Sequence, residues 1–135
     1  MTGTGTVPSL PRDENLSLAV VIYGLYVASL LGFAPAALVG VIMAHVAGAT
    51  AGPVAAGHYR FQVRTFWIGL AAWVVAAISI FWGTLLSAIL IGIPFLIVAT
   101  VAVGAIWLWA LVRSAAGLVW AAQGSGCPRP DSLLL

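Results

Sequence analysis

The chain has 135 residues, of which 63% are hydrophobic and only 6% are charged, and its mean hydropathy is +1.16. An ordinary soluble domain is about 45–50% apolar and about 25% charged. So few charges cannot cover the surface of a soluble fold, and the composition therefore predicts a membrane protein. The five basic residues are all arginines scattered along the chain, which excludes the clustered basic surface of a nucleic-acid-binding protein.

Residues 1–14 are rich in Gly, Thr and Pro, a composition typical of a disordered leader. No positive charge stands next to Met1, and the apolar segment after Glu14 is longer than the roughly 7–15 residues of a signal-peptide core. We therefore expect this segment to be retained as a first helix, capped by Asn15 or Ser17.

Two long stretches carry no charged residue, one between Glu14 and Arg60 and one between Arg64 and Arg113. A spanning helix needs about 20 apolar residues, so each stretch is long enough for two. The predicted fold class is all-α, a polytopic transmembrane bundle of four helices in two helical hairpins. The predicted segments are a four-helix domain over residues 15–120, with spans at about 16–33, 35–48, 58–90 and 94–116, and a disordered tail over 121–135.

The turns of this bundle are predicted from glycine and proline. Gly32 and Pro35 separate the first two helices, because proline lacks an N–H and disfavours helix in the residue before it. The last two helices can be separated at Gly83 or at Gly92–Pro94. We favour the second, because proline is well tolerated at a helix start and poorly tolerated inside one.

Small residues recur every fourth position along the second helix, at Ala36, Gly40, Ala44 and Gly48. Such a stripe predicts close approach of another helix, which is the main source of helix association in lipid. Chance in an Ala/Gly-rich segment is the alternative. On the first helix, Tyr23 and Tyr26 share a face, and we expect their hydroxyls to bond to the third or fourth helix or to line a polar cavity.

An aromatic and basic segment opens the third helix. It consists of His58, Tyr59, Arg60, Phe61, Gln62, Arg64, Thr65, Phe66 and Trp67. Arg60 and Arg64 are four residues apart and hence on one helical face, and aromatic rings favour the headgroup layer. The segment is interpreted as an interfacial entrance to the third helix, and Trp109 with Arg113 as the matching exit of the fourth.

Orientation follows from the arginines. In a four-span bundle both termini and the central connector lie on one side, and Arg12, Arg60, Arg64, Arg113 and Arg129 all fall there. By the positive-inside rule that side is the cytoplasm. The prediction is a multi-pass protein of the bacterial inner membrane with both ends cytoplasmic.

Few residues invite a chemical role. His45 and His58 are expected at one depth and could serve as haem ligands, but two lone histidines without a binding-motif spacing are better explained as interfacial groups hydrogen-bonded to backbone or headgroups. The single Cys127 excludes an intrachain disulfide and a multi-cysteine metal site. The serines and threonines lack an acid or base partner at a sensible spacing. We therefore predict no catalytic residue, cofactor or metal, and expect that the protein is not an enzyme.

Three stretches together resemble a family of small bacterial four-helix membrane proteins of unassigned function. They are Tyr23–Tyr26, Gly40–Ala44 and His58–Leu70, with the His-Tyr-Arg-Phe-Gln-x-Arg-Thr-Phe-Trp string as the most specific. That family is related to the twenty-kilodalton component of the chloroplast inner-envelope import translocon. The resemblance implies a four-span bundle over about residues 16–120 with cytoplasmic ends. Gly57 stands where serine is usual, and the connector 49–57 lacks the usual charges.

These observations lead to three hypotheses for function. The first is a non-enzymatic assembly or accessory subunit whose partners are the lipid bilayer and either a second copy or another membrane protein. The second is a pore or translocation component, as in the chloroplast relatives. The third is a haem- or quinone-binding subunit that uses His45 and His58.

Overall fold

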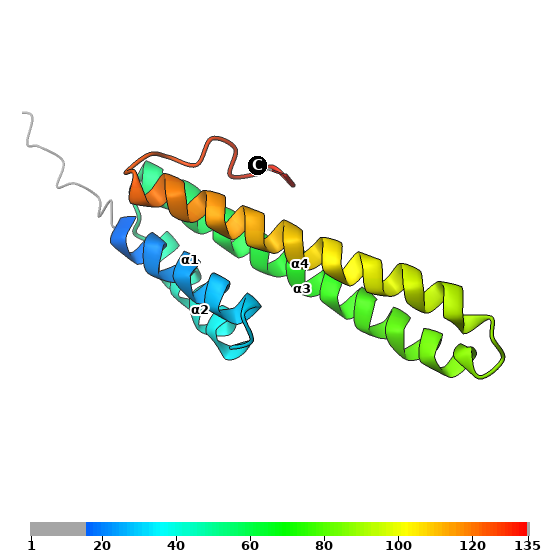
Figure 1. Cartoon of the computed structure of the whole chain (residues 1–135). Helices are drawn as coiled ribbons and strands as arrows, with labels where there is room; N and C mark the ends of the chain where they lie inside the picture. Colours follow the sequence, from blue (N-terminus) through cyan, green and yellow to red (C-terminus); the bar gives the residue numbers. More distant parts are fainter. Residues whose placement is uncertain (1–15, 135) are drawn as a thin grey trace, which may run out of the picture.

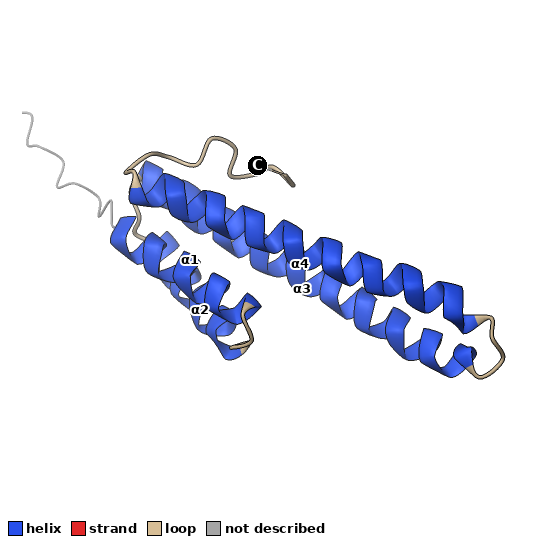
Figure 2. Cartoon of the chain, viewed as in Figure 1, coloured by secondary structure: helices blue, strands red, loops and turns tan. Residues whose placement is uncertain are grey.

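The computed structural model describes residues 16–134, which form four helices and, over that range, no strand (Figures 1 and 2). The helices are α1 (Leu16–Leu30), α2 (Pro35–Gly48), α3 (Pro53–Ser87) and α4 (Gly92–Ala122). They pair as two antiparallel hairpins, α1–α2 and α3–α4. The all-α prediction is confirmed. The predicted leader and the Asn15 cap lie outside the described residues.

Glycine and proline set the helix ends. After α1 the chain turns at Gly32, where φ is +121°, and the Phe33 N–H donates to the Ala28 carbonyl at 3.1 Å. This bond closes a Schellman motif, in which a left-handed glycine satisfies the last carbonyls of the helix. Pro35 and Pro53 then begin α2 and α3, where a missing N–H costs nothing.

The turn between α3 and α4 occupies residues 88–91, and α3 passes Gly83 without a break. Gly92 is the first residue of α4, in close contact with the end of α3. A Cβ atom there would lie 2.3 Å from the Gly83 carbonyl oxygen and 2.2 Å from the Ser87 nitrogen. Only glycine fits this contact, which explains why the hairpin closes beside Gly92 rather than at Gly83.

The helices differ in length. At about 1.5 Å per residue, α3 and α4 are about 52 and 46 Å long, whereas α1 and α2 are about 22 and 21 Å. The hydrocarbon core of a bilayer is about 30 Å thick. Two helices, α3 and α4, are therefore long and apolar enough to cross a membrane. Four spans were expected, but the break between Gly32 and Pro35 leaves two helices shorter than the core.

The α1–α2 hairpin packs against only one end of the α3–α4 hairpin (Figure 1). α1 contacts α4 and α2, and α2 contacts α3. We call residues 53–69 and 107–122 the proximal half of the α3–α4 hairpin, and residues 70–106 the distal half. The boundary is marked by Trp107, whose indole N–H donates to the Leu30 carbonyl at the end of α1 at 3.0 Å.

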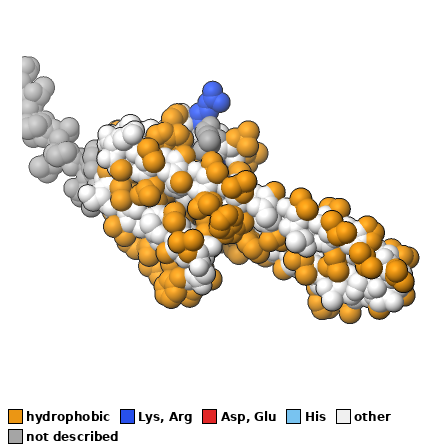
Figure 3. Space-filling view, viewed as in Figure 1, with side chains coloured by type: hydrophobic (Ala, Val, Ile, Leu, Met, Phe, Trp, Pro, Cys, Tyr) orange, Lys and Arg blue, Asp and Glu red, His pale blue; other side chains and the backbone are white. Residues whose placement is uncertain are grey.

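The core lies in the proximal half. Its buried residues come from all four helices and are Ala19, Ile22, Tyr23, Tyr26, Ala44, Ala55, Tyr59, Phe61 and Ala121. In the distal half only small residues are buried between the two helices, namely Ala76, Gly83, Gly92 and Ala99. The larger apolar side chains there point outward, and hydrophobic atoms cover this end of the molecule (Figure 3). A continuous apolar surface of this kind is typical of contact with lipid or with other membrane helices.

The C-terminal segment differs from the expectation of a disordered tail. After α4 the chain reverses at Gly124, with φ +70°, and runs back along the proximal half (Figure 1). Its carbonyls accept hydrogen bonds from side chains of α3 and α4, including the Trp109 indole, which donates to Leu133 at 2.8 Å. The Gly/Pro-rich composition gave no sign of this docking, because the tail accepts its hydrogen bonds from α3 and α4 through backbone carbonyls.

Candidate functional site

The most unusual feature of the proximal half is a layer of buried polar side chains. Along α3 they follow the helical period, at His58, Gln62 and Thr65, which are 0%, 0% and 6% exposed. Arg113 of α4 faces them and is 1% exposed. We call these four residues, with Tyr23 and Tyr26 of α1, the polar layer. Polar groups buried among apolar helices are usually hydrogen-bonded, so each of these side chains is expected to have a partner.

His58 joins three segments that are distant in the sequence. Its Nε2 lies 2.8 Å from the Ser125 carbonyl of the tail, and its Nδ1 lies 3.2 Å from the Tyr23 hydroxyl. Because a carbonyl only accepts, Nε2 donates to Ser125, and the Tyr23 hydroxyl is the partner of Nδ1. Both ring nitrogens are therefore occupied. His58 therefore fastens α1 and the tail to α3.

A second pair of contacts joins α1 to α3 one turn further along. The Tyr26 hydroxyl donates to the Gln62 backbone carbonyl at 3.1 Å, and the Gln62 side-chain amide donates to the Ala19 carbonyl at 2.9 Å. The prediction that both tyrosines bond across to the third or fourth helix is thus confirmed, and α3 is the partner in each case. The Gln62 Oε1 has no hydrogen-bond partner among the described residues.

The interpretation of Arg113 as part of an interfacial exit from the fourth helix is wrong, because its side chain is buried. Its guanidinium stacks 3.8 Å from the centroid of the Phe61 ring, and its Nε donates to the Thr65 hydroxyl at 2.7 Å. The tail covers it from outside, where Leu134 supplies a carbonyl to Nη1. An arginine buried in this way retains its charge, because the guanidinium is not deprotonated in proteins.

A sequence signal for this burial was present. Arg113 stands in a row of small residues at helical spacing, formed by Ala110, Ser114, Gly117 and Ala121, all buried. A face of small residues leaves room for neighbouring helices, and an arginine within it is enclosed rather than exposed. At Gly117 the approach is closest, since an added Cβ would lie 2.3 Å from the Tyr23 ring.

The aromatic and basic segment of α3 is divided between two environments. His58, Tyr59, Phe61, Gln62 and Thr65 are buried in the proximal half. Arg60 and Trp67 are exposed, and Arg64 and Phe66 are partly buried. The segment was interpreted as wholly interfacial, but one helical face of it forms the polar layer. The spacing of residues along a helix shows which of them share a face, but it does not show which face the neighbouring helices cover.

The small-residue stripe of α2 faces the chain's own helices. A Cβ on Gly40 would lie 2.8 Å from the Tyr26 ring, and one on Gly48 would lie 3.7 Å from Tyr59. Ala36 and Ala44 are buried on the same side. The stripe therefore serves packing against α1 and α3, and it is not free to bind a second copy.

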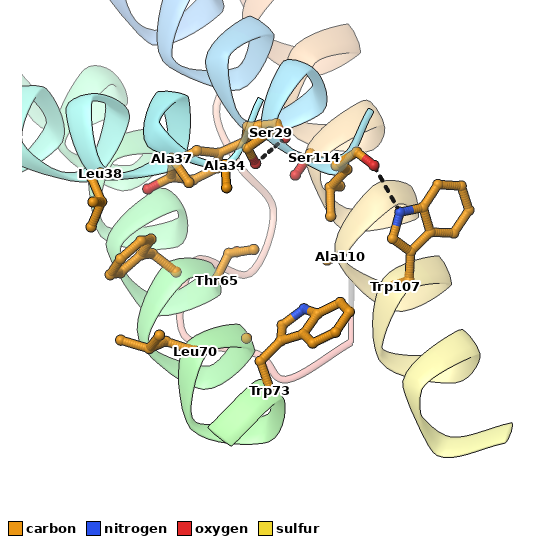
Figure 4. A pocket seen from close by; sticks show the side chains of 14 residues that line it. Ser29, Ala34, Ala37, Leu38, Thr65, Leu70, Trp73, Trp107, Ala110 and Ser114 are labelled. Carbon is orange, nitrogen blue, oxygen red and sulfur yellow. Dashed lines mark hydrogen bonds between the residues drawn. The ribbon is translucent and has the colours of Figure 1, made fainter. Parts of the chain in front are cut away.

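A groove opens beside the polar layer, where the α1–α2 turn meets the α3–α4 hairpin (Figure 4). Its volume is about 590 Å³, and its walls include Leu38, Leu70, Trp73 and Trp107. Ser29, Thr65 and Ser114 also line it. The groove is largely apolar and lies on the level at which α1 ends and α2 begins.

The two histidines proposed as haem ligands occupy different environments. His45 is exposed on α2, with Nδ1 2.8 Å from the Val41 carbonyl of its own helix. His58 is fully buried with both nitrogens bonded, so iron could bind it only by displacing Tyr23 or the tail. Over the described residues no group of three or more His, Cys, Asp or Glu side chains is arranged to hold a metal ion.

Comparison of the chain with known protein families, curated proteins and solved structures finds no match. The role of these residues is therefore inferred from their contacts. The polar layer uses most of its hydrogen-bonding groups to join helices and to hold the tail. Asp131, the one carboxylate within the described range, pairs with Arg60 at 3.6 Å on the surface.

Proposed function

We propose that this chain is a multi-pass protein of the bacterial inner membrane that has both ends in the cytoplasm. In this proposal it is a non-enzymatic assembly or accessory subunit that packs against other membrane helices, as a homo-oligomer or within a larger complex. The observation that carries the proposal is the distal half of the α3–α4 hairpin, which α1 and α2 leave uncovered although its outer surface is apolar.

Length and charge support the topology. The charge-free parts of the long helices, residues 65–87 and 92–112, are about 34 and 32 Å long, close to the about 30 Å of the hydrocarbon core. Arg60, Arg64, Arg113 and Arg129 all lie beyond the same end of this apolar section. Two crossings keep both termini on one side, as four would. In this arrangement α1 and α2 enter from the cytoplasmic side and turn back part-way.

The outer face of α4 supports assembly with another helix. Val101 and Gly104 lie along one exposed strip of the distal half, which Leu108 continues just beyond its boundary, and an added Cβ on Gly104 would meet no atom within 4 Å. A glycine between larger apolar residues allows a second helix to approach closely, which favours van der Waals packing in lipid. The equivalent small residues of α2 are occupied by α1, so the distal half is the better contact surface.

Translocation, the role suggested by the resemblance to the import family, needs a polar path. The distal hydroxyls of Thr84, Ser87 and Thr100 donate to carbonyls of their own helices at 2.6–2.8 Å. They therefore offer little to a water-filled channel within one chain. Solute flux through liposomes that contain the purified protein would favour this second role, and its absence would leave assembly as the role.

Photo-crosslinking tests the assembly proposal. A photoreactive amino acid at Val101 on the distal half is compared with one at Val46, an equally apolar residue that is 71% exposed on α2. We expect protein adducts from position 101 in native membranes, with a second copy or with another subunit, and few from position 46. A protein that is strictly monomeric in mild detergent and gives only lipid adducts at position 101 would refute the proposal.

The proposed orientation has its own test. Replacement of both Arg60 and Arg64 by Glu reverses the charge that marks the cytoplasmic side, so we expect altered insertion or lower expression. Protease accessibility of tagged termini in membrane vesicles measures this. Unchanged accessibility and expression would contradict the proposed topology.

A further inference from the structure

Three arginines lie beneath or beside the C-terminal segment, at the end of the apolar section of α3 and α4. Arg60 and Arg64 lie on one face of α3, one turn apart, and Arg113 of α4 donates at 2.7 Å to the hydroxyl of Thr65, the residue that follows Arg64. Residues 131–134 cross this group, because Asp131 pairs with Arg60 and the Leu134 carbonyl accepts from Arg113. The crossing segment places Ser132 between these two contacts.

These side chains retain hydrogen-bonding capacity that the described residues do not use. The Arg113 Nη2, the Arg64 Nε and the Ser132 hydroxyl are each buried without a hydrogen-bond partner in that part of the chain. A buried donor without a partner is costly, and a charged one is more so. Arg113 is 1% exposed, so solvent does not compensate it.

The positive charge of Arg113 also lacks a negatively charged partner among the described residues. The partners of Arg113 within residues 16–134 are neutral: the Thr65 hydroxyl, the Leu134 carbonyl and the rings of Phe61 and Trp109. Asp131 is the one carboxylate in that range, and it pairs with Arg60 on the surface. Arg64 and Arg113 thus place two positive charges and two free N–H groups at neighbouring positions of α3 and α4, and no carboxylate side chain of residues 16–134 pairs with either.

We propose that Arg64, Arg113 and the Ser132 hydroxyl form a binding site for one phosphate group, that of an anionic phospholipid headgroup. Planar guanidinium groups match the geometry of phosphate oxygens, and a hydroxyl supplies a further donor. The site lies where the charge-free sections of α3 and α4 end, which is the level of the headgroups in the proposed topology. The conclusion that the phosphate belongs to a lipid rests on the proposed topology. The conclusion that the site binds a phosphate group does not.

Because Ser132 belongs to the tail and Arg64 to α3, a bound phosphate also joins the tail to the helices. Cys127 reports on this connection, since it is the only cysteine of the chain and is partly buried against the core. Phosphate binding is therefore expected to slow maleimide labelling of Cys127. Release of the tail would make labelling faster.

Native mass spectrometry of the full-length protein in detergent tests the site, with phosphatidylglycerol as the anionic probe and phosphatidylcholine as the zwitterionic one. We expect one retained phosphatidylglycerol in the wild type, and binding at least about tenfold weaker in Arg64→Gln, the size expected for a lost charged hydrogen bond. Arg129→Gln is the matched control, because it removes the same charge from an exposed tail position and should bind as the wild type does. Arg64→Lys keeps the charge without Nε and should also bind weakly.

Inorganic phosphate distinguishes the two sources of the ligand. Displacement of the lipid by millimolar phosphate, with slower Cys127 labelling, supports one shared site. Slower labelling by phosphate without lipid retention places a free phosphate there and removes the lipid source, while the assembly proposal stands on its own crosslinks. Equal losses in Arg64→Gln and Arg129→Gln, or no effect of either probe, would overturn the site. Arg113→Gln is a secondary variant, since its burial couples binding to folding.

Discussion

Replacement of Gly117 by alanine is expected to disturb the contact between α1 and α4 more than any change of similar size. The added Cβ would lie 2.3 Å from two ring carbons of Tyr23 and 2.5 Å from its hydroxyl oxygen. Atoms cannot remain that close, so the ring or the helix must move. Tyr23 is 1% exposed and its hydroxyl is bonded to His58, so the ring has no free space to enter.

The cost has two parts. Forcing an extra carbon into a packed core costs about 1–3 kcal/mol. Displacing the Tyr23 ring also breaks the hydrogen bond to His58, which contributes about 1 kcal/mol. The free energy of unfolding should therefore fall by about 2–4 kcal/mol. The loss should shrink in a Tyr23→Leu background, because the shorter side chain removes the atoms that clash, and contacting residues are not additive.

Unfolding of the purified protein in mixed micelles by sodium dodecyl sulfate, followed by tryptophan fluorescence, measures this. Gly24→Ala is the matched control. Gly24 lies next to Tyr23 on the exposed side of α1, and a Cβ added there would meet no atom within 4 Å. That variant should be as stable as the wild type or up to about 1 kcal/mol more stable, because alanine favours helix over glycine. A Gly117→Ala protein that unfolds with the wild-type free energy would refute the described packing of α1 on α4.

Four further predictions test other parts of the structure. Gly92→Ala should open the α3–α4 hairpin, because its Cβ meets backbone atoms at 2.2–2.4 Å, and faster proteolysis near residues 88–91 would show it. Leu90→Gly should stabilise the same turn by about 1 kcal/mol, since φ is +59° at Leu90; a less stable variant would contradict that conformation. Thr65→Val should cost about 1–3 kcal/mol by removing the acceptor of the Arg113 Nε, whereas Thr65→Ser should retain most stability in the same micelle titration. Burial raises the pKa of the Cys127 thiol above its ordinary 9.0, so maleimide labelling should be slower than in unfolded protein at pH 8 and should rise with pH; equal rates would show that the tail is undocked.

Several features of this protein followed from the sequence alone. The all-helical class follows from apolar stretches broken only at Gly32–Pro35, Pro53 and Gly92, because proline and glycine interrupt helices locally. The apolar surface follows from composition, since so few charges cannot cover a soluble fold. The bonds of Tyr23 and Tyr26 across to another helix followed from their shared face and the need of a buried hydroxyl for a partner.

Tertiary structure decided the rest. The distal half of α3 and α4 is uncovered because these helices are much longer than α1 and α2, a difference that hydropathy does not reveal. Whether Arg113 lies at a membrane surface or inside the protein depends on how closely α1, α3 and the tail approach α4, and glycine contacts set that approach. The hydrogen bonds that hold the tail to α3 and α4 use its backbone carbonyls, which every residue has and which therefore leave no mark on the sequence. Local chemistry thus determined the elements, and the distances between them determined the site.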